Sequence, residues 1–308
     1  MFRLVGETHI DFIGGRKVAF VLSSILVLLG LTALTMISTG HANLGIDFAG
    51  GVMITGHFEK PVAIDDLRKA ISSKYPDAQI TELKQFEKPN AFIIKVKNPE
   101  TQAEGVKRAA DLRQIISAKF SGNNFTSDSE HIIGPAVGET LRSDAEKAVL
   151  LSLLGIIIYI WVRFDFRSGI AATVATFHDV LAVLGVVWVL HLEFDLLIVT
   201  ALLTLAGYSL TDTVVVFDRI RDNIKKYRTK GEFANAVNLS INEVLSRTIN
   251  TSLTTFVVVL SLFVFGGEVL RDFSFALGLG IIVGTYSSVF VASPLVVEWE
   301  HRRPQRFK

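Results

Sequence analysis

An acidic residue lies inside a long apolar stretch of the chain. Asp212 belongs to the sequence AGYSLTDTVVVFDRIRDN and is the one charged residue between positions 196 and 217. Ionising a carboxyl group within lipid is costly, so intramembrane acids are typical of proton relays and ion pathways. On a helix that begins at Leu196, Asp212 would lie about 24 Å along the axis, in the inner half of a membrane. Asp212 is therefore the first candidate for a proton pathway.

The same stretch carries a polar residue at every fourth position, namely Thr200, Thr204, Tyr208 and Asp212. This spacing predicts one polar face on a helix. Such faces lie against other helices or a water-filled cavity, because hydrocarbon cannot satisfy polar groups. We therefore expect Thr204 and Tyr208 to support Asp212.

A second acid lies in the apolar stretch 168–190, in the sequence ATFHDVLAV. Asp179 follows Thr173 and Thr176 at three-residue spacing, which makes Asp179 the second candidate for the pathway. His178 precedes it directly. Because successive helical residues point about 100° apart, we expect His178 to hydrogen-bond a neighbouring helix rather than share the site of Asp179.

The first half of the stretch 248–267 is rich in hydroxyl and amide side chains. One predicted helix face carries Arg247, Asn250, Thr251 and Thr254. This face predicts a hydrated cleft open to the cytoplasm, at the depth of Asp212, with Arg247 near its mouth. The alternative for Arg247 is ordinary anchoring of a helix end at the membrane surface.

Two intramembrane carboxyl groups beside a wettable threonine face match what a proton path needs, so H⁺ is the predicted coupling ion. Na⁺ is the alternative, although a sodium site would want more carboxylate or carbonyl oxygens than the sequence places there. A purely structural, hydrogen-bonded core is a third interpretation.

The composition places these residues in a membrane protein. Hydrophobic residues make up 50% of the 308, and the charged residues collect in blocks between long uncharged runs. Six spans are predicted, at residues 18–37, 148–162, 168–190, 196–217, 248–267 and 273–297. The first is longer than a usual signal-peptide core and favours a retained helix. The second has only 15 residues and spans the membrane if Lys147 and Arg163 extend to the two interfaces.

Lysine and arginine predict the orientation of these spans. With the N-terminus in the cytoplasm, the cytoplasmic segments hold 16 such residues, and the two short outer loops hold only Arg271. Residues 1–17 and the tail 298–308 are then cytoplasmic. Residues 218–247 form an amphipathic cytoplasmic segment, with a break near Gly231 and an apolar stripe in the membrane interface.

Residues 38–147 form the predicted extracytoplasmic domain. Its pattern is strand, helix, strand, strand, helix, strand, which matches the ferredoxin-like βαββαβ unit. The predicted fold is thus a polytopic α-helical membrane protein of six transmembrane helices with a ferredoxin-like α+β domain between the first two. The domain holds no catalytic constellation, so the chain is predicted not to be an enzyme and to need no cofactor. The net charge of +1 gives no reason to expect nucleic acid.

The last span carries small residues at four-residue spacing, namely Ala276, Gly280, Gly284, Ser288 and Ala292. This pattern predicts a groove in which another helix packs closely. Its role is structural.

Five motifs in order resemble the SecD/SecF family of protein-export membrane proteins, within the resistance-nodulation-division superfamily. They are GIDFAGG (Gly45, Asp47, Gly50, Gly51), GPAVGETL (Gly134, Pro135, Gly138), FHDV, GYSLTDTVVVFDRIRDN (Gly207, Asp218, Arg219) and GTYSSVFVASPL. The resemblance covers nearly the whole chain. From the residues alone, Gly50 and Gly51 are expected to serve a bulge or turn where a strand begins.

The resemblance implies a function in protein export. Members of the family pair with a SecD-like subunit, associate with the SecYEG channel and use the proton-motive force to help move unfolded polypeptides outward across the bacterial inner membrane. A YidC-like insertase is a further implied partner, and membrane lipid surrounds the helices. The family analogy assigns the acid tied to proton flow to Asp212, with Arg247 and Asp179 as further members.

Two other functions stay open from the sequence. A small-molecule efflux permease would need a substrate pocket and larger outer domains. A scaffold that only steadies the channel complex predicts that Asp179 and Asp212 are replaceable without loss of function.

Overall fold

The structure is a computed structural model, and it describes residues 6, 8–83, 90–97, 99–226 and 233–303. Within these residues, six helical segments are long and apolar enough to cross a membrane. They are α1 (Arg16–Ser38), α5 (Pro135–Arg163), α6 (Phe166–Val189), α7 (Leu196–Lys226), α8 (Phe233–Phe265) and the sixth, composed of α9 (Gly267–Ser287), the π-helical turn η1 (Ser288–Ala292) and α10 (Ser293–Arg302). The expected class, a six-helix membrane protein with a small α+β domain, is confirmed.

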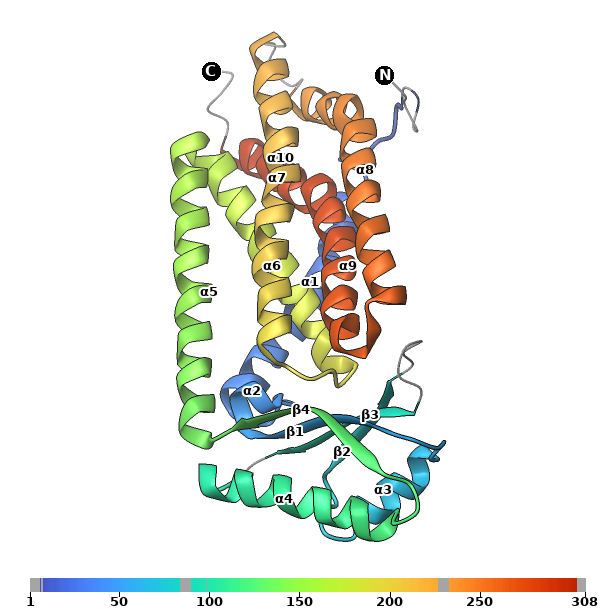
Figure 1. The fold of residues 1–308 in the computed structure, drawn as a ribbon. Coiled ribbons are helices and arrows are strands. Elements are labelled where there is room, and N and C mark those ends of the chain that lie inside the picture. Colours follow the sequence, from blue (N-terminus) through green and yellow to red (C-terminus); the bar gives the residue numbers. More distant parts are fainter. Residues whose placement is uncertain (1–5, 7, 84–89, 98, 227–232, 304–308) are drawn as a thin grey trace.

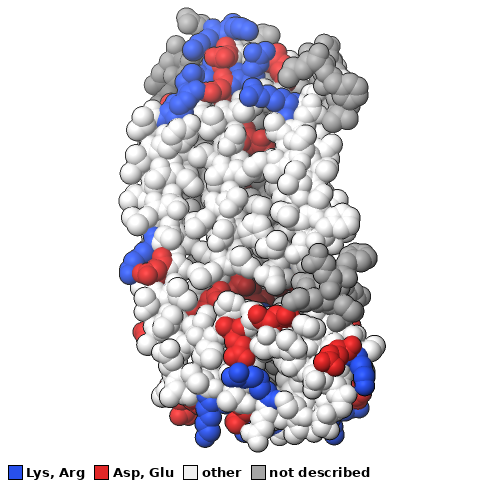
Figure 2. All heavy atoms as spheres, viewed as in Figure 1, with Lys and Arg blue, Asp and Glu red and all other residues white. Residues whose placement is uncertain are grey.

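The molecule is elongated, with the sheet at one end of the helix bundle and α10 at the other (Figure 1). Figure 2 shows a broad band of mostly uncharged residues along the bundle, between a cluster of Lys and Arg at the end opposite the sheet and charged residues of both signs on the sheet domain. Such a band is what a hydrocarbon layer requires. The chain is therefore a multi-pass membrane protein.

The small domain follows the predicted order of elements. They are α2 (Ile46–Ala49), β1 (Gly51–Phe58), α3 (Ile64–Ser72), β2 (Gln79–Leu83), β3 (Ala91–Lys97), α4 (Gln102–Lys119) and β4 (Phe125–Ile133). The strand order β2-β3-β1-β4, with every pair antiparallel, is that of the ferredoxin-like fold. Phe58, Phe92 and Leu112 lie in its core, between the sheet and the helices α3 and α4. The sequence EKPN at residues 87–90 predicts a hairpin turn between β2 and β3, and most of it lies outside the described residues.

The helix that contains the predicted second span is longer than that span. Helix α5 begins at Pro135, so residues 135–147 continue the helix beyond the predicted bounds 148–162. Gly134 stands at the N-cap and proline at the first helical position, where its missing N–H costs nothing. Gly138 then lets α5 approach α2, since a Cβ there would lie 3.1 Å from the Phe48 carbonyl oxygen.

Two family motifs therefore meet in space. Gly50 ends α2 with a φ of +73°, in the region that favours glycine, as expected for a turn before a strand. A Cβ on Gly50 would also crowd Ile133 and Pro135. GIDFAGG and GPAVGETL thus form one joint between the sheet and α5.

The expectation that the apolar stripe of the amphipathic segment lies in the membrane interface is wrong. Its apolar stripe does not face lipid, because Phe233, Val237 and Ile241 are buried in a cluster with residues of α7 and α10. The protein interior offers these side chains more complete burial than an interface does. Helix α7 continues unbroken to Lys226, and α8 extends the fifth span from Phe233. The break expected near Gly231 lies outside the described residues, as do residues 1–5 and 304–308.

The first turns of α8 also hold the segment that precedes α1. The side chain of Asn238 accepts from the Phe12 N–H (2.9 Å) and donates to the Ile10 carbonyl (2.9 Å). Asn242 repeats this pattern on Ile10 alone, with two contacts of 2.9 Å. The two amides satisfy backbone groups that a strand partner would otherwise satisfy.

Small residues allow the central helices to approach each other closely. A Cβ on Gly280 would lie 2.7 Å from Leu205, and one on Gly284 would lie 3.0 Å from the Cβ of Ser209. The predicted small-residue groove of the last span is thus filled by α7. This packing sets the distance between the helices that carry the polar residues of the bundle.

The outer domain is attached to the start of α7. Phe194 pairs with Leu44 in a short parallel bridge, and the Asp47 carboxylate accepts from the Leu196 N–H at 3.1 Å. Glu193 forms ion pairs with Lys95 (2.5 Å) and Lys97 (2.7 Å) of the sheet. The Asp of GIDFAGG therefore caps the helix that carries Asp212 in its middle.

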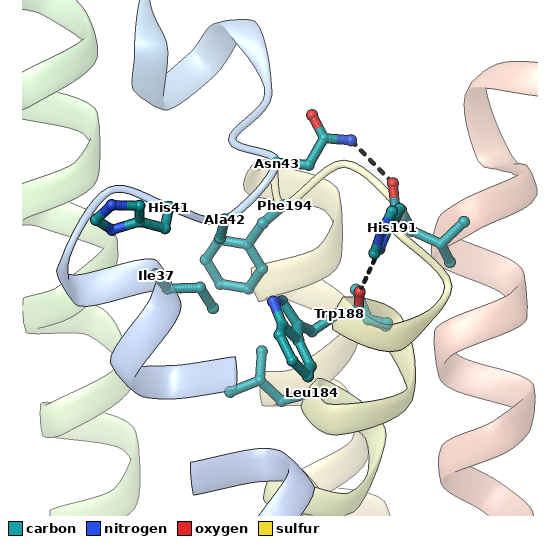
Figure 3. Close-up of a pocket in the computed structure, with 10 residues that line it drawn as sticks. Ile37, His41, Ala42, Asn43, Leu184, Trp188, His191 and Phe194 are labelled. Atoms are coloured by element: carbon teal, nitrogen blue, oxygen red, sulfur yellow. Dashed lines mark hydrogen bonds between the residues drawn. The ribbon is translucent and has the colours of Figure 1, made fainter. Parts of the chain in front are cut away.

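A cavity of about 250 Å³ lies beside this attachment. Figure 3 shows Ile37, Leu184, Trp188 and Phe194 around it, with Asn43 bonded to the His191 carbonyl. Its lining contains none of the carboxylates of the candidate pathway, so this cavity belongs to the joint between domain and bundle.

Candidate functional site

Two acids lie within the bundle on neighbouring helices. Asp179, in the middle of α6, is completely buried, and Asp212, in the middle of α7, is 5% exposed. Both helices pack against α9 in the centre of the bundle, which excludes lipid from the two carboxyl groups. Each acid therefore depends on protein groups for hydrogen bonds.

Asp179 accepts hydrogen bonds from three helices. Oδ2 receives the Ser209 hydroxyl of α7 through a short contact and the Ser287 hydroxyl of α9 at 2.7 Å. Oδ1 lies 2.8 Å from Nδ1 of His178. The absence of a side chain at Gly284 lets Ser209 come close enough to α9 for this arrangement. Asp179 is thus the point at which α6, α7 and α9 are joined.

The expectation for His178 is wrong. Although adjacent helical residues diverge by about 100°, the imidazole folds back onto the carboxylate of the next residue. The ring of Tyr286 lies 6.3 Å from the His178 ring, and its hydroxyl donates to the Ala19 carbonyl of α1 at 3.0 Å. The site of Asp179 therefore extends through His178 towards α1.

Asp212 has a different set of partners. Its Oδ2 accepts from the Ser252 hydroxyl of α8 at 3.1 Å, and Ser252 accepts in turn from Thr285 of α9 at 2.7 Å. Thr285 therefore reaches the carboxyl group of Asp212 through Ser252. Asp212 thus joins α7 to α8 and α9.

The two acids are close along the same helices. Ser209 and Asp212 are three residues apart on α7, which corresponds to about 4.5 Å of axial rise. Thr285 and Ser287 are two residues apart on α9. The hydroxyl groups of one site therefore lie within one helical turn of those of the other.

Further hydroxyls in this part of the bundle are buried without a protein partner. Within the described residues, these are the side-chain oxygens of Tyr208, Thr213 and Thr248. Such groups are generally satisfied by water when the site is polar. The interior around Asp212 is therefore suited to hold water.

The predicted polar stripe of α7 does not reach Asp212 as a continuous face. Thr204 is exposed and its hydroxyl donates to the Thr200 carbonyl at 2.8 Å, whereas Tyr208 is half-buried and Asp212 is buried. A four-residue step turns a helix by 400°, so the stripe drifts by about 40° at each step. Three steps turn it by about 120°, away from the face that starts at Thr200.

The polar face predicted for α8 lies on the exposed surface of the helix bundle. Arg247, Thr251 and Thr254 are exposed, and the Thr254 hydroxyl donates to the Thr251 carbonyl at 2.9 Å. The Thr251 hydroxyl donates to carbonyls of its own helix, those of Arg247 (3.1 Å) and Thr248 (2.9 Å). Ser252, about 100° further around the helix, supplies the direct contact instead.

Four residues that hold the acids were not among those predicted, namely Ser209, Ser252, Thr285 and Ser287. The sequence contained one relevant signal, the run of hydroxyl side chains TYSS in an otherwise apolar span. Which helix these hydroxyls face depends on helix packing, which periodicity alone does not supply.

The charged end of α7 forms ion pairs with other helices. Asp218 binds Arg163 at the end of α5 (2.6 Å), and Arg219 binds Glu243 of α8 (2.6 Å). These motif residues therefore fasten the ends of helices and do not contact Asp212. Among the described residues, no group of three or more His, Cys, Asp and Glu could hold a metal ion.

Two family models match the sequence. The model described as protein export membrane protein SecD/SecF, C-terminal, matches residues 114–302, and the SecD/SecF GG motif matches residues 37–62. The second match contains the joint formed by GIDFAGG.

Similar proteins carry names from protein export. The chain is 47% identical over 300 residues to the protein translocase subunit SecF of Thermodesulfovibrio yellowstonii, covering 96% of this chain and 97% of that protein. It is 39% identical over 301 residues to the protein translocase subunit SecDF of Thermus thermophilus, covering 96% of this chain but only 39% of that protein.

Solved structures agree with the fold. The crystal structure of SecDF from Thermus thermophilus, described as a translocon-associated membrane protein, matches with a TM-score of 0.78 at 38% identity. The match covers 96% of this chain and 39% of that one. SecDF in its super-membrane-facing form matches with a TM-score of 0.70. The chain thus corresponds to less than half of a SecDF protein.

Proposed function

The chain belongs to the SecD/SecF family of protein-export membrane proteins, and we propose that it works with a SecD-like subunit as a proton-driven part of the Sec translocase. In this proposal the pair uses the proton-motive force to complete export of unfolded polypeptides through the SecYEG channel. The chain moves protons and changes shape but catalyses no covalent reaction.

The contacts of Asp212 carry this proposal. An intramembrane carboxyl group that joins three helices through hydroxyls changes those contacts when it gains or loses a proton. The ionised form accepts from Ser252, which in turn accepts from Thr285, whereas the protonated form also becomes a donor. Proton exchange at Asp212 would therefore shift the packing of α7 against α8 and α9.

The energy available suits such a shift. A proton that crosses about 100 mV releases roughly 2.3 kcal/mol, which is comparable to a few hydrogen bonds. The buried hydroxyls of Tyr208, Thr213 and Thr248 support a hydrated route to Asp212. H⁺ is the preferred coupling ion, because among the described residues the Asp212 carboxyl group is hydrogen-bonded to the Ser252 hydroxyl and has no second carboxylate beside it.

The outward faces of α7 and α8 support a SecD-like partner. The exposed face of α7 carries Thr200, Thr204, Gly207 and Thr211, and a Cβ on Gly207 would meet nothing within 4 Å. Small residues and hydroxyls bonded to their own helix suit close packing of another membrane helix. Arg247 and Thr254 lie on the exposed face of α8, so a partner packed here would enclose the side of the pathway that this chain leaves open.

We further propose that the end of the molecule opposite the sheet lies in the cytoplasm, with both chain termini. The support is the concentration of Lys and Arg at that end (Figure 2) and the positive-inside rule. The sheet domain then projects outward from the inner membrane, on the side where the exported polypeptide emerges. Contacts with SecYEG, a YidC-like insertase and the polypeptide rest on the family resemblance.

Proton conductance tests the proposal. Vesicles that contain this protein, a SecD-like partner and the SecYEG channel are supplied with a precursor, and conductance is compared between wild type and Asp212→Asn. Loss of at least about tenfold is expected, because asparagine keeps the size of the side chain but cannot carry a proton. The matched control is Asp218→Asn, which removes a carboxylate of the same helix outside the pathway.

Unchanged conductance in Asp212→Asn, with assembly verified, would leave the scaffold function as the better account. Replacing the proton gradient by a sodium gradient separates the two ions: export that follows the sodium gradient would contradict the choice of H⁺.

A further inference from the structure

We propose that His178 is a second proton-binding residue, whose Nε2 takes up the proton while Asp179 balances the charge. This inference deepens the proposed function and rests on it. Proton binding at His178 is a role beyond the joining of α6, α7 and α9 by Asp179.

The hydrogen bonds of Asp179 determine which nitrogen of His178 is open. Its Oδ2 accepts from Ser209 and Ser287, so its Oδ1 is left for the Nδ1–H of His178 at 2.8 Å. A carboxylate that accepts from one ring nitrogen holds the imidazole in one tautomer and one orientation. The lone pair of the neutral imidazole is then on Nε2.

Within the described residues, Nε2 of His178 is buried and has no hydrogen-bond partner. The whole side chain is only 3% exposed. A histidine that merely ties helices together uses both ring nitrogens, because an unsatisfied buried nitrogen costs stability. An open basic nitrogen in the bundle interior is instead the arrangement that a proton acceptor needs.

The groups around His178 stabilise a protonated imidazole. On its own helix the facing charge is Asp179, at hydrogen-bond distance, so the protonated pair has no net charge. On α9 the facing titratable group is Tyr286, whose hydroxyl is already bonded to Ala19 of α1. Ser209 of α7 and Ser287 of α9 complete the surroundings without charge.

The proton balance is simple. Hydronium gives its proton to the Nε2 lone pair and becomes water, and release returns the proton to water. No other bond is made or broken, and Asp179 keeps its three hydrogen bonds throughout. His178 therefore stores a proton without disturbing the junction of α6, α7 and α9, whereas proton exchange at Asp212 alters its own contacts.

His178→Asn separates this role from a structural one. The amide nitrogen of asparagine can take the place of Nδ1 and still donate to Asp179, but asparagine has no counterpart of Nε2. The matched control is His191→Asn, because His191 lies in the loop before α7 with a φ of +55°, which asparagine tolerates. Conductance is measured across a pH series in vesicles with the SecD-like partner.

The expected result is a loss of about tenfold in conductance for His178→Asn and the loss of one titration step from its pH profile, with His191→Asn unchanged. Wild-type conductance and pH profile in His178→Asn would overturn the inference. Asp212→Asn runs in parallel: if it is inactive while His178→Asn is normal, only the inference fails, and if Asp212→Asn is normal, the proposed function fails.

A direct measurement covers variants that fail to assemble. Solid-state ¹⁵N spectra of histidine-labelled wild-type protein in liposomes are recorded as the pH falls, with the His178 signal assigned by its loss in His178→Asn or by residue-selective dephasing. An Nε2 that changes from lone-pair to N–H character while Nδ1 stays protonated supports the inference. An Nε2 that carries a hydrogen at every pH would refute it.

Discussion

The sites of Asp179 and Asp212 use the same chemistry in opposite ways. Asp179 is completely buried and receives donors from α6, α7 and α9. Asp212 retains slight exposure, has one closely bonded hydroxyl and lies beside the open faces of α7 and α8. The Asp179 carboxyl group therefore accepts from groups on three helices, whereas the Asp212 carboxyl group has few donors and can exchange them.

This difference suggests that the helices around Asp179 keep their arrangement, whereas those around Asp212 can move. A fully satisfied buried network rigidifies the helices that it joins. A carboxyl group with fewer partners can exchange protons and partners at lower cost. We therefore expect substitutions of Asp179 and its two serine donors to act mainly on stability and those at Asp212 mainly on proton movement.

The largest expected effect on stability comes from Asp179→Ala. It leaves the Ser209 hydroxyl and the Nδ1–H of His178 buried without their acceptor, while Ser287 keeps the Gly284 carbonyl, at a cost on the order of 3 kcal/mol. Asp212→Ala removes one close acceptor and should cost about 1–2 kcal/mol. Unfolding of both variants in detergent measures the difference, and equal costs would end the distinction between the two sites.

Gly284→Val should come next. Its Cβ would meet that of Ser209 at 3.0 Å, so α7 and α9 must separate, with an expected loss of about 1–3 kcal/mol. Gly207→Val is the matched control, since the same β-branched side chain there projects into open space. Thermal unfolding of the purified chain measures both variants. A Gly284 variant as stable as the Gly207 variant would show that the helices do not depend on this close approach.

Single hydroxyl deletions should be smaller and should sharpen the same comparison. Ser209→Ala removes a donor from a fully enclosed carboxylate and is expected to cost about 1–2 kcal/mol. Ser252→Ala removes the donor of a longer hydrogen bond (3.1 Å) to Asp212, which retains slight exposure, and should cost less than about 1 kcal/mol. Chemical unfolding gives both values, and the reverse order would contradict the picture of a saturated and an adaptable site.

The last effect is confined to the joint with the outer domain. Burial alone would raise the pKa of Glu193, but Lys95 and Lys97 outweigh it and hold the pKa of this carboxyl group below its usual value of 4.5. A lowered folded-state pKa means that the stabilisation is complete above the usual value and is lost as the pH falls through the folded-state value. The protection of residues 41–45 against hydrogen exchange, relative to the intrinsic rate at each pH, should therefore fall only in acid below pH 4.5.

Glu193→Gln tests this joint at neutral pH. The variant should show the faster exchange of residues 41–45 without acidification, at a cost on the order of 1 kcal/mol. Exchange that accelerates in acid to the same extent in the variant would assign the pH dependence to other groups.

Periodicity and turn chemistry in the sequence predicted a large part of the molecule. Six apolar segments, the βαββαβ order of the outer domain and the isolated acids Asp179 and Asp212 all follow from local rules. Each rule concerns residues near one another in the chain: hydrophobic length, period-two alternation, or a charge where none is expected. The start of α5 was missed because its first turns are polar and carry no hydrophobic signal.

Only the tertiary structure decided which polar groups meet. Ser209, Ser252 and Ser287 look alike in the sequence, and the packing of α7, α8 and α9 selects which carboxyl group each one serves. The sequence placed Asp212 in a membrane, and the close approach at Gly284 placed its helix against α9. Helical spacing determines which residues share a face, but the crossing of helices determines what that face contacts.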